Sequence, residues 1–315
     1  MVEKQQESKN YAVIPKSINN PFFQAVRNGC NEMASRLSND TVKVTCIFDG
    51  PNTTDEGKDA SQWQKKMLNE IIQTNTLNGV PIHGVSISVN DDTELTSKIN
   101  ETVAAGITVI TFDSDAPDSQ RSTHIGTNNT AFGEMLGKML IQSGPEEGGT
   151  YSIITTIEKP ALNLQHRAEG IQDKLTEWDS QKWKLNGIFY GHGTTDGSLD
   201  KMRESMEKYP DQKAIIPVGF WPMTNITKWN EFVSNHTNLT TVVGDALNIQ
   251  IELLRSLKVD ALVGQTPFLM GKLSICDFYN LFALFVFMFV LLFYTKHCEN
   301  IHRASLFLSP CSNTF

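Results

Sequence analysis

Residues 11–30 read YAVIPKSINNPFFQAVRNGC and predict a short strand followed by a helix. The apolar run at residues 11–14 is typical of a buried strand. Asn20 is a favourable N-cap, and Pro21 is a favourable first residue of a helix. Beyond them, apolar residues recur every three or four positions, as one face of a helix requires. They are Phe23, Val26, Cys30, Met33 and Leu37.

The same alternation of strand and helix continues to residue 264. Further runs rich in β-branched residues predict strands at residues 42–48, 84–89, 107–112, 151–157, 185–190, 213–218, 240–244 and 260–264. Most of these strands are separated by segments in which apolar residues recur at helical spacing, for example Leu95, Ile99 and Val103. Because right-handed crossovers place helices on both faces of a parallel sheet, the pattern predicts a doubly wound α/β fold. The number of strands indicates two such sheets, with a polar seam near residues 114–128.

The composition excludes some functional classes. The chain of 315 residues carries 27 Lys and Arg against 35 Asp and Glu, and a net charge of −8 does not suit a phosphate backbone. We therefore expect no nucleic-acid partner. Five cysteines are too few for a disulfide framework, and their odd number leaves at least one thiol unpaired within the chain. The cysteine count therefore does not indicate whether the protein resides in an oxidising or a reducing compartment.

Motifs of catalysis are missing from the sequence. It contains no GxGxxG after a strand, no GxxxxGK[ST], no GxSxG, no HExxH and no CxxC pair, and its seven histidines are scattered. We therefore expect no enzyme, no catalytic residue, no metal site and no cofactor.

The C-terminal region is strongly apolar. Every residue from Leu281 to Tyr294 is apolar, which predicts a helix that is apolar on all sides and belongs in a larger core or a membrane. Residues 273–294 reach the roughly 20 residues that a bilayer crossing needs, if Asp277 and Asn280 are tolerated. A membrane segment is favoured over a buried helix, and an incorrect exon boundary or reading frame is a third alternative. Residues 1–10 hold no apolar stretch typical of a secretory signal.

Ligands of open parallel sheets bind beyond the carboxyl ends of the strands, so residues that follow strands are the candidates for a site. Asn20, Phe22 and Phe23 follow the first strand. Two adjacent phenylalanines cannot both face the core of one helix, so we expect one ring to present its face to a ligand such as a sugar. The alternative is a capped helix with two core aromatic residues.

Charged candidates come next. Asp113 and Asp115 follow the strand at 107–112, and carboxylates accept hydrogen bonds from vicinal hydroxyls. The alternative for them is an ordinary turn with Asp as a helix cap. Asn163 and Arg167 lie four positions apart on a predicted helix and share one face. A guanidinium donates paired hydrogen bonds to adjacent oxygens, although a solvated surface arginine is the simpler alternative.

Three more candidates follow later strands. Trp221 comes after the strand at 213–218, Asp245 after 240–244 and Gln265 after 260–264. Trp221 could belong to a rigid aromatic loop, and Gln265 could simply satisfy backbone groups.

Taken in order, these stretches resemble the periplasmic sugar-binding proteins of the ribose-binding type, the solute receptors of ABC importers. The resemblance runs from Tyr11 to about Gly271 and covers most of the chain. It rests on the stretch quoted first and on ITVITFDSD, IGTNN followed by Gly133, NLQHRAEGI, VVGDALNIQIELLRS and VDALVGQTPFLMG.

The resemblance implies two αβ lobes joined by a hinge of three strand crossings, with a monosaccharide-sized ligand clamped between the lobes. The resemblance assigns ligand binding to Asn20, Phe22, Phe23 and Asp113 in the first lobe, Arg167 and Asp245 in the second and Gln265 at the hinge. Asp115 and Trp221 are further ligand-binding candidates on the ground of their positions after strands. Where many relatives have Arg after the strand-end Asp, this chain has Ser114. The run Gly219-Phe220-Trp221 replaces a common Asn-Asp pair, so we expect a sugar or polyol other than ribose.

The expected organisation has six segments. They are a polar extension (1–10), the first lobe (11–126), the second lobe (127–264), a hinge return with a helix on the first lobe (265–280), the apolar helix (281–294) and a tail (295–315).

The expected function is reversible, non-catalytic binding of a small sugar or polyol with hinge closure, outside the cytoplasm. An ABC-importer permease or a signalling protein is the expected partner, with membrane association through residues 273–294. The alternatives are a membrane-anchored receptor ectodomain and, less favoured, a sugar-acting enzyme on the same fold.

Overall fold

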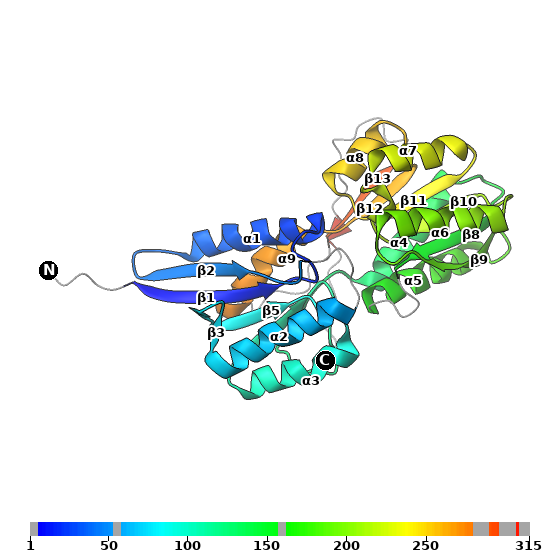
Figure 1. The fold of residues 1–315 in the computed structure, drawn as a ribbon. Coiled ribbons are helices and arrows are strands. Elements are labelled where there is room, and N and C mark those ends of the chain that lie inside the picture. The colour runs from blue at the N-terminus through cyan, green and yellow to red at the C-terminus, as the bar shows by residue number, and fades with distance from the viewer. Residues whose placement is uncertain (1–5, 53–57, 157–161, 280–289, 296–306, 309–315) are drawn as a thin grey trace. The chain divides into compact units, whose positions relative to one another are not determined.

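The computed structural model describes residues 6–52, 58–156, 162–279, 290–295 and 307–308 (Figure 1). These residues form two compact units. Unit 1 comprises the described residues within 1–126 and 266–286, and unit 2 comprises those within 127–265 and 287–315.

Unit 1 is a parallel sheet with helices on both faces. The strand order is β2-β1-β5-β6-β7, and its strands are β1 (Glu7–Ile14), β2 (Val42–Phe48), β5 (Gly84–Ile87), β6 (Val109–Phe112) and β7 (His124–Ile125). Helices α1 (Pro21–Leu37) and α9 (Pro267–Cys276) lie on one face, and α2 (Lys58–Thr74) and α3 (Asp92–Ala104) lie on the other (Figure 1). Each face has its own apolar cluster, so both faces of the sheet are buried.

Unit 1 also has two small elements. The turn at Asn78-Gly79, where both residues have positive φ, joins β3 (Thr76–Leu77) and β4 (Val80–Pro81) into a hairpin. Asn-Gly in this position is typical of a two-residue hairpin loop. A short helix, η2 (Asp277–Tyr279), follows α9.

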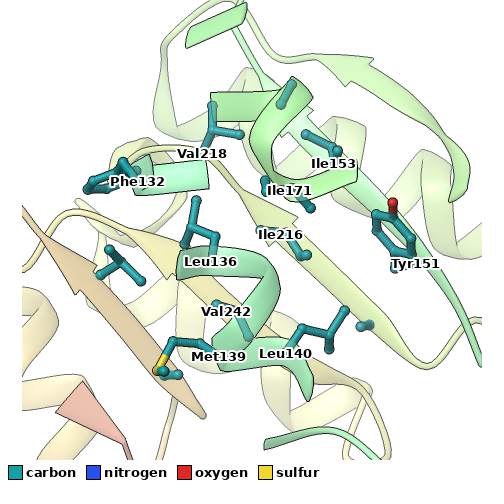
Figure 2. Close-up of a cluster of buried hydrophobic side chains, with 14 of the residues drawn as sticks. Phe132, Leu136, Met139, Leu140, Tyr151, Ile153, Ile171, Ile216, Val218 and Val242 are labelled. Atoms are coloured by element: carbon teal, nitrogen blue, oxygen red, sulfur yellow. The ribbon is translucent and has the colours of Figure 1, made fainter. Parts of the chain in front are cut away.

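Unit 2 repeats the plan with a larger sheet. The order is β14-β13-β12-β11-β10-β8-β9, and the parallel strands are β8 (Gly149–Thr155), β9 (Trp183–Tyr190), β10 (Ala214–Pro217), β11 (Thr240–Gly244) and β12 (Ala261–Gly264). Helices α4 (Asn129–Ser143) and α5 (Leu162–Asp179) bury one apolar cluster, shown in Figure 2. Helices α6 (Thr195–Lys208), α7 (Ile226–Asn235) and α8 (Asn248–Arg255) bury the cluster on the other face.

Glycines bring pairs of helices into backbone contact in both units. A Cβ atom on Gly133 of α4 would lie 2.1 Å from the carbonyl oxygen of Arg167, and one on Gly170 of α5 would lie 2.2 Å from that of Thr130. In unit 1, a Cβ on Gly29 of α1 or Gly271 of α9 would lie 1.9 Å from a carbonyl oxygen of the facing helix. Only residues without a side chain fit at these crossings.

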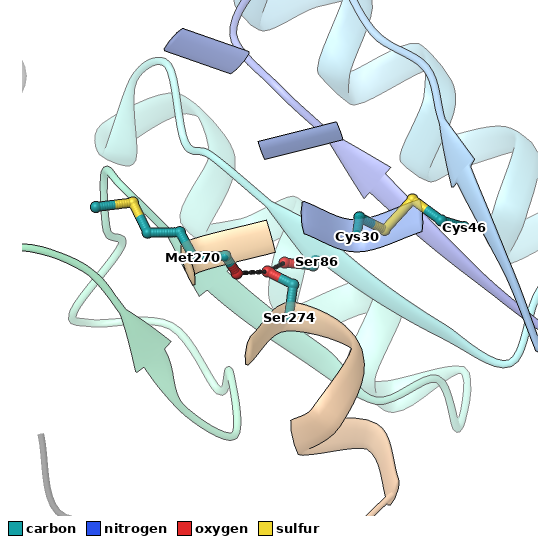
Figure 3. The surroundings of a disulfide bond; sticks show 5 residues. All are labelled: Cys30, Cys46, Ser86, Met270 and Ser274. Carbon is teal, nitrogen blue, oxygen red and sulfur yellow. Dashed lines mark hydrogen bonds between the residues drawn. A yellow bond between two sulfur atoms is a disulfide. The ribbon is translucent and has the colours of Figure 1, made fainter. Parts of the chain in front are cut away.

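Unit 1 contains a disulfide bond between Cys30 on α1 and Cys46 on β2, with a Cα–Cα distance of 6.0 Å (Figure 3). Beside it, Ser86 Oγ of β5 donates a hydrogen bond to Ser274 Oγ of α9 at 2.9 Å. The sequence did not indicate the pairing of Cys30 with Cys46. Among the described cysteines, Cys276 is a buried free thiol, and Cys298 and Cys311 lie outside the described residues.

The α/β architecture with parallel sheets is confirmed, and each of the predicted strands is present. Their bounds differ by a few residues. The largest difference is at β1, which begins at Glu7 and pairs with β2 from there. Residues 7–10 are therefore part of the sheet, not of a polar extension, because their backbone extends the ladder of β2 although the side chains of residues 7–9 are partly or fully exposed.

The helix predicted over residues 281–294 is wrong at its end. Residues Val290–Thr295 form strand β13, which pairs antiparallel with β12, and β14 (Phe307–Leu308) pairs with β13. A short apolar run has no periodicity that distinguishes a buried helix from a buried strand, and here the open edge of β12 provides a partner. Residues 281–289 lie outside the described residues. None of the helices in the described part of the chain combines the length and apolar character that a membrane crossing needs.

Candidate functional site

Unit 1 has a buried ion pair at the carboxyl edge of its sheet. Asp113 directly follows β6, and its Oδ2 lies 3.7 Å from Nζ of Lys16, which follows β1. The two side chains are only 4% and 8% exposed. Ser88 Oγ, beyond the end of β5, donates a hydrogen bond to the same carboxylate oxygen at 3.0 Å. Three neighbouring strands therefore deliver a cation, an anion and a hydroxyl to one place.

Asp113 is held there by an unusual backbone conformation. Its φ is 59°, a left-handed value that residues with a Cβ seldom adopt, and its N–H donates to the carbonyl oxygen of Ile125 at 3.0 Å. Strain of this kind persists where the surrounding structure fixes it, and it concentrates at functional sites.

Sequence reasoning missed Lys16, although a signal was present. The residue follows the apolar run of β1 after a single proline, so it occupies the strand-end position that nominated Asp113 and Asp245. A lysine there is ordinarily assumed to be solvated. The structure instead buries it beside Asp113.

The first turn of α1 departs from the prediction. Asn20 caps the helix, since its side-chain oxygen accepts a hydrogen bond from the N–H of Phe22 at 2.9 Å. Phe22 and Phe23 are both buried in the same cluster, with their rings edge to face at 5.2 Å, so the premise that two adjacent phenylalanines cannot both face the core is wrong. Adjacent helical residues are about 100° apart, and a buried stripe of that width accommodates both.

Asp115 belongs to a network within its own loop. Its carboxylate accepts hydrogen bonds from Thr111 Oγ1 at 2.6 Å, from Arg121 Nη2 at 2.5 Å and from Arg121 Nε, and lies 3.5 Å from His124 Nδ1. Burial opposes the charged form, but the bonds from Arg121 and Thr111 and the positive charges nearby hold the pKa of Asp115 below its usual value. Burial also lowers the pKa of His124. These contacts within the turn fit the alternative of an ordinary turn for Asp115.

In unit 2, Arg167 is fixed at the carboxyl edge of the sheet. The side chain is 2% exposed. Its Nε donates to Asn129 Oδ1 at 2.9 Å, and its Nη1 donates to the carbonyl oxygen of Val218 at 3.0 Å. The guanidinium carbon lies 4.2 Å from the centre of the Phe132 ring. The glycine crossing of α4 and α5 makes these contacts possible, so the arginine is buried and oriented rather than solvated.

Asp245 and Gln265, which follow β11 and β12, are hydrogen-bonded to each other in unit 2. Gln265 Nε2 donates to Asp245 Oδ1 at 2.6 Å, and Thr127 Oγ1 donates to Gln265 Oε1 at 2.8 Å. Asp245 Oδ2 accepts from the N–H of Phe220 at 3.2 Å. Asp245, like Asp113, follows a strand with a left-handed φ, here 71°. The carboxylate is thereby held at the end of β11.

Trp221 lies in the short helix η1 (Trp221–Met223) after β10. It is buried, and its ring stacks on Phe220 with a centroid distance of 5.9 Å. Both aromatic residues belong to the cluster beneath α4 and α5. This arrangement fits the alternative of a rigid aromatic loop.

Within the described ranges, no group of three or more His, Cys, Asp or Glu side chains is arranged to hold a metal ion. The polar residues at the strand ends are mixed donors and acceptors. Two α/β units with buried polar side chains at the carboxyl edges of their sheets define a class of ligand-binding proteins.

Comparison with known proteins identifies the family. A family model described as a periplasmic binding protein domain matches residues 11–282, and the chain belongs to this family. No curated protein matches the chain.

Solved structures show the same fold. An ABC transporter solute-binding protein from Burkholderia graminis in complex with D-arabinose is 23% identical, with a TM-score of 0.77 over 93% of this chain and 97% of that chain. GanP, a glucose-galactose binding protein from Geobacillus stearothermophilus, is 20% identical, with a TM-score of 0.77 over 93% and 99%. A solute-binding protein from Agrobacterium vitis bound with α-D-tagatopyranose is 15% identical, with a TM-score of 0.76 over 91% and 95%.

Proposed function

We propose that the chain binds a small sugar or polyol reversibly and without chemical conversion, with polar side chains at the carboxyl edges of its sheets. The observation that carries the proposal is the set of buried polar side chains at the carboxyl edge of each sheet. They are Lys16 and Asp113 in unit 1 and Arg167, Asp245 and Gln265 in unit 2.

The chemistry of these groups suits a polyhydroxylated ligand. Each sugar hydroxyl can donate one hydrogen bond and accept others, so a sugar needs both kinds of partner. The carboxylates of Asp113 and Asp245 accept, and the ammonium of Lys16 and the guanidinium of Arg167 donate. Hydrogen bonds that involve a charged partner are stronger than those between neutral groups, which gives affinity without any catalytic group.

The similar structures support the ligand class. Those compared above are complexes with D-arabinose and α-D-tagatopyranose or are described as binding glucose and galactose. We infer a pentose or hexose as the ligand of this chain. Asn20, Phe22, Phe23, Asp115 and Trp221 stay in the proposal as neighbours that shape the site, although in this structure the contacts of each are accounted for within its own unit.

An extracytoplasmic location, in a periplasm or at a cell surface, is part of the proposal. The family and the Cys30–Cys46 disulfide support it, because disulfides persist in oxidising compartments. The partner proposed on the same basis is the permease of an ABC importer or a signalling protein that responds to the bound sugar.

A thermal-shift screen of the full chain tests the function. D-arabinose, D-tagatose, D-glucose and D-galactose would each be added, and the sugar recovered afterwards for analysis. A ligand that binds only the folded protein stabilises it by about 2.7 kcal/mol at a hundredfold excess over Kd, so we expect a raised Tm for at least one sugar and no conversion of it. Unchanged Tm values across the panel, or turnover of the sugar that binds, would overturn the proposal.

A further inference from the structure

Four side-chain oxygens in unit 2 are buried without a hydrogen-bond partner among the described residues, and two of them lie at the end of β8 and the start of α5. These two are Oγ1 of Thr155 and Oδ1 of Asn163. The side chains are 2% and 7% exposed. Buried polar side-chain atoms are nearly always hydrogen-bonded, so each such exception asks for an explanation.

The positions of these two residues relate them to Arg167. Thr155 is the last residue of β8, at the carboxyl end of the strand. Asn163 is in the first turn of α5, four residues before Arg167 and on the same helical face. Both therefore lie at the edge of the sheet where ligands of this fold class bind.

The pleat of β8 shows which face Thr155 occupies. Tyr151 and Ile153 belong to the cluster beneath α4 and α5, seen in Figure 2, whereas Ile154 belongs to the cluster beneath α6, α7 and α8. Side chains alternate along a strand, so Thr155 points to the α5 face with Tyr151 and Ile153. On that face, Arg167 Nη1 donates a hydrogen bond to the carbonyl oxygen of Val218. The N–H of Val218 in turn donates to the carbonyl oxygen of Ile154, the residue before Thr155.

We propose that Thr155 and Asn163 determine sugar specificity, with Asn163 Oδ1 accepting a hydrogen bond from one ligand hydroxyl and Thr155 Oγ1 pairing with another. The inference rests on the proposed function and deepens it. Hydrogen bonds to Asn129 and Val218 already fix the orientation of Arg167, so its guanidinium is a fixed reference point beside Thr155 and Asn163. In this proposal, the two oxygens lack partners among the described residues because the ligand supplies them.

Near-isosteric substitutions test this role. Asn163→Leu and Thr155→Val remove the polar atom and keep the approximate volume. We expect each to weaken the Kd about tenfold, because a sugar hydroxyl then loses its partner in a dry site. The Tm of the ligand-free protein should stay equal or rise, because an apolar group replaces a buried polar atom that has no partner. A structural role would instead lower the Tm.

Asn230→Leu is the matched control. Asn230 lies within α7, on the other face of the sheet, and its Oδ1 is also buried without a described partner. This variant repeats the chemical change away from the strand ends, and its affinity should stay within about twofold of the parent.

Isothermal titration of the full chain and the three variants with D-arabinose, D-tagatose, D-glucose and D-galactose decides the outcome. Tenfold losses in both test variants at an undiminished Tm support the inference. If the parent binds a sugar and either test variant binds it equally well, or loses affinity together with several degrees of Tm, the inference is overturned and the proposed function stands. If the parent binds none of the four sugars, the proposed function falls, and the inference with it.

Discussion

At the carboxyl edge of the sheet in unit 1, a lysine and an aspartate form a buried ion pair, whereas in unit 2 an arginine is held by an amide and a carbonyl oxygen. Both units place an aspartate directly after a strand in a left-handed conformation, Asp113 in one and Asp245 in the other. In both, glycines let two helices touch through their backbones. The shared plan is therefore in the backbone, and the difference is in the charged side chains.

This difference separates two roles of the sequence, which are to position the backbone at the strand ends and to select the charged side chains there. The strand ends and the glycine crossings set the backbone positions of the candidate site. Many different side chains are compatible with that backbone. In the proposed function, the choice of lysine or arginine sets how each side chain would bind a ligand, because an ammonium is a compact charge and a guanidinium is a planar fork with fixed donors. Substitutions that act on one role should leave the other unaffected.

Breaking the ion pair of unit 1 should have the largest effect. Lys16→Met leaves Asp113 as a buried charge without its cation, and removal of one partner of a buried pair costs about 3–5 kcal/mol. Urea unfolding followed by circular dichroism measures it. The double variant Lys16→Met/Asp113→Leu should recover most of this loss. Equal stability of parent and single variant would show that the pair is not buried in solution.

Filling the glycine crossings should cost slightly less and should affect both units alike. Gly133→Ala and Gly271→Ala would each place a methyl group about 2 Å from a carbonyl oxygen, and overpacking of this kind costs on the order of 3 kcal/mol. Gly187→Ala is the control, because its nearest contact would be an ordinary 3.6 Å. Hydrogen exchange would assign each loss to its unit, and similar stability of all three variants would contradict the close crossings.

The disulfide should stabilise unit 1 alone. It closes a loop with a sequence separation of 16, for which chain entropy predicts about 3 kcal/mol. Cys30→Ala/Cys46→Ala should lower the free energy of unfolding by about that amount. A reducing agent should lower the Tm of the parent and leave that of the variant unchanged. A parent whose Tm does not respond after verified reduction would argue against the bond.

The pH dependence should be the smallest effect near neutrality, and it should differ in direction between the units. In unit 1, burial lowers the pKa of His124 and the bonds from Arg121 help to lower that of Asp115, so the unfolded chain binds more protons in acid. Stability is then lost as the pH falls below about 6.5 for the histidine and below about 4 for the aspartate. In unit 2, burial raises the pKa of Tyr151 to about 12, so stability is lost as the pH rises from about 10 towards that value.

Two variants isolate these slopes. His124→Gln should flatten the decline of unfolding free energy between pH 6.5 and 5, and Tyr151→Phe should flatten the decline above pH 10. Chemical unfolding at a series of pH values measures both. Unchanged slopes in the two variants would show that other groups cause them.

Most of the fold could be predicted from the sequence because its strands are short β-branched runs separated by amphipathic helices. The predictions failed where packing rather than pattern decides. The apolar run at Val290–Thr295 carries no period, so only the open edge of β12 selects a strand. Phe22 and Phe23 share one core because the buried stripe is wide enough for both.

The candidate site residues divide in the same way. Asp113, Arg167, Asp245 and Gln265 stand at strand ends or on a helix beside them, so position alone nominated them. Lys16 was missed because its burial depends on Asp113, which is distant in sequence. The Cys30–Cys46 pair was missed because each cysteine reads as part of an ordinary helix or strand.

The central proposal is that the buried polar side chains at the strand ends bind a sugar, and a double-mutant cycle by isothermal titration tests it most directly. The parent, Asp113→Ala, Arg167→Ala and the double variant would be titrated with the panel sugar that raises the Tm. We expect one site per chain in the parent and a loss of at least about 1.5 kcal/mol, more than tenfold in Kd, from each single substitution. If either single variant that remains folded binds like the parent, the substituted side chain takes no part in binding and the proposal is contradicted.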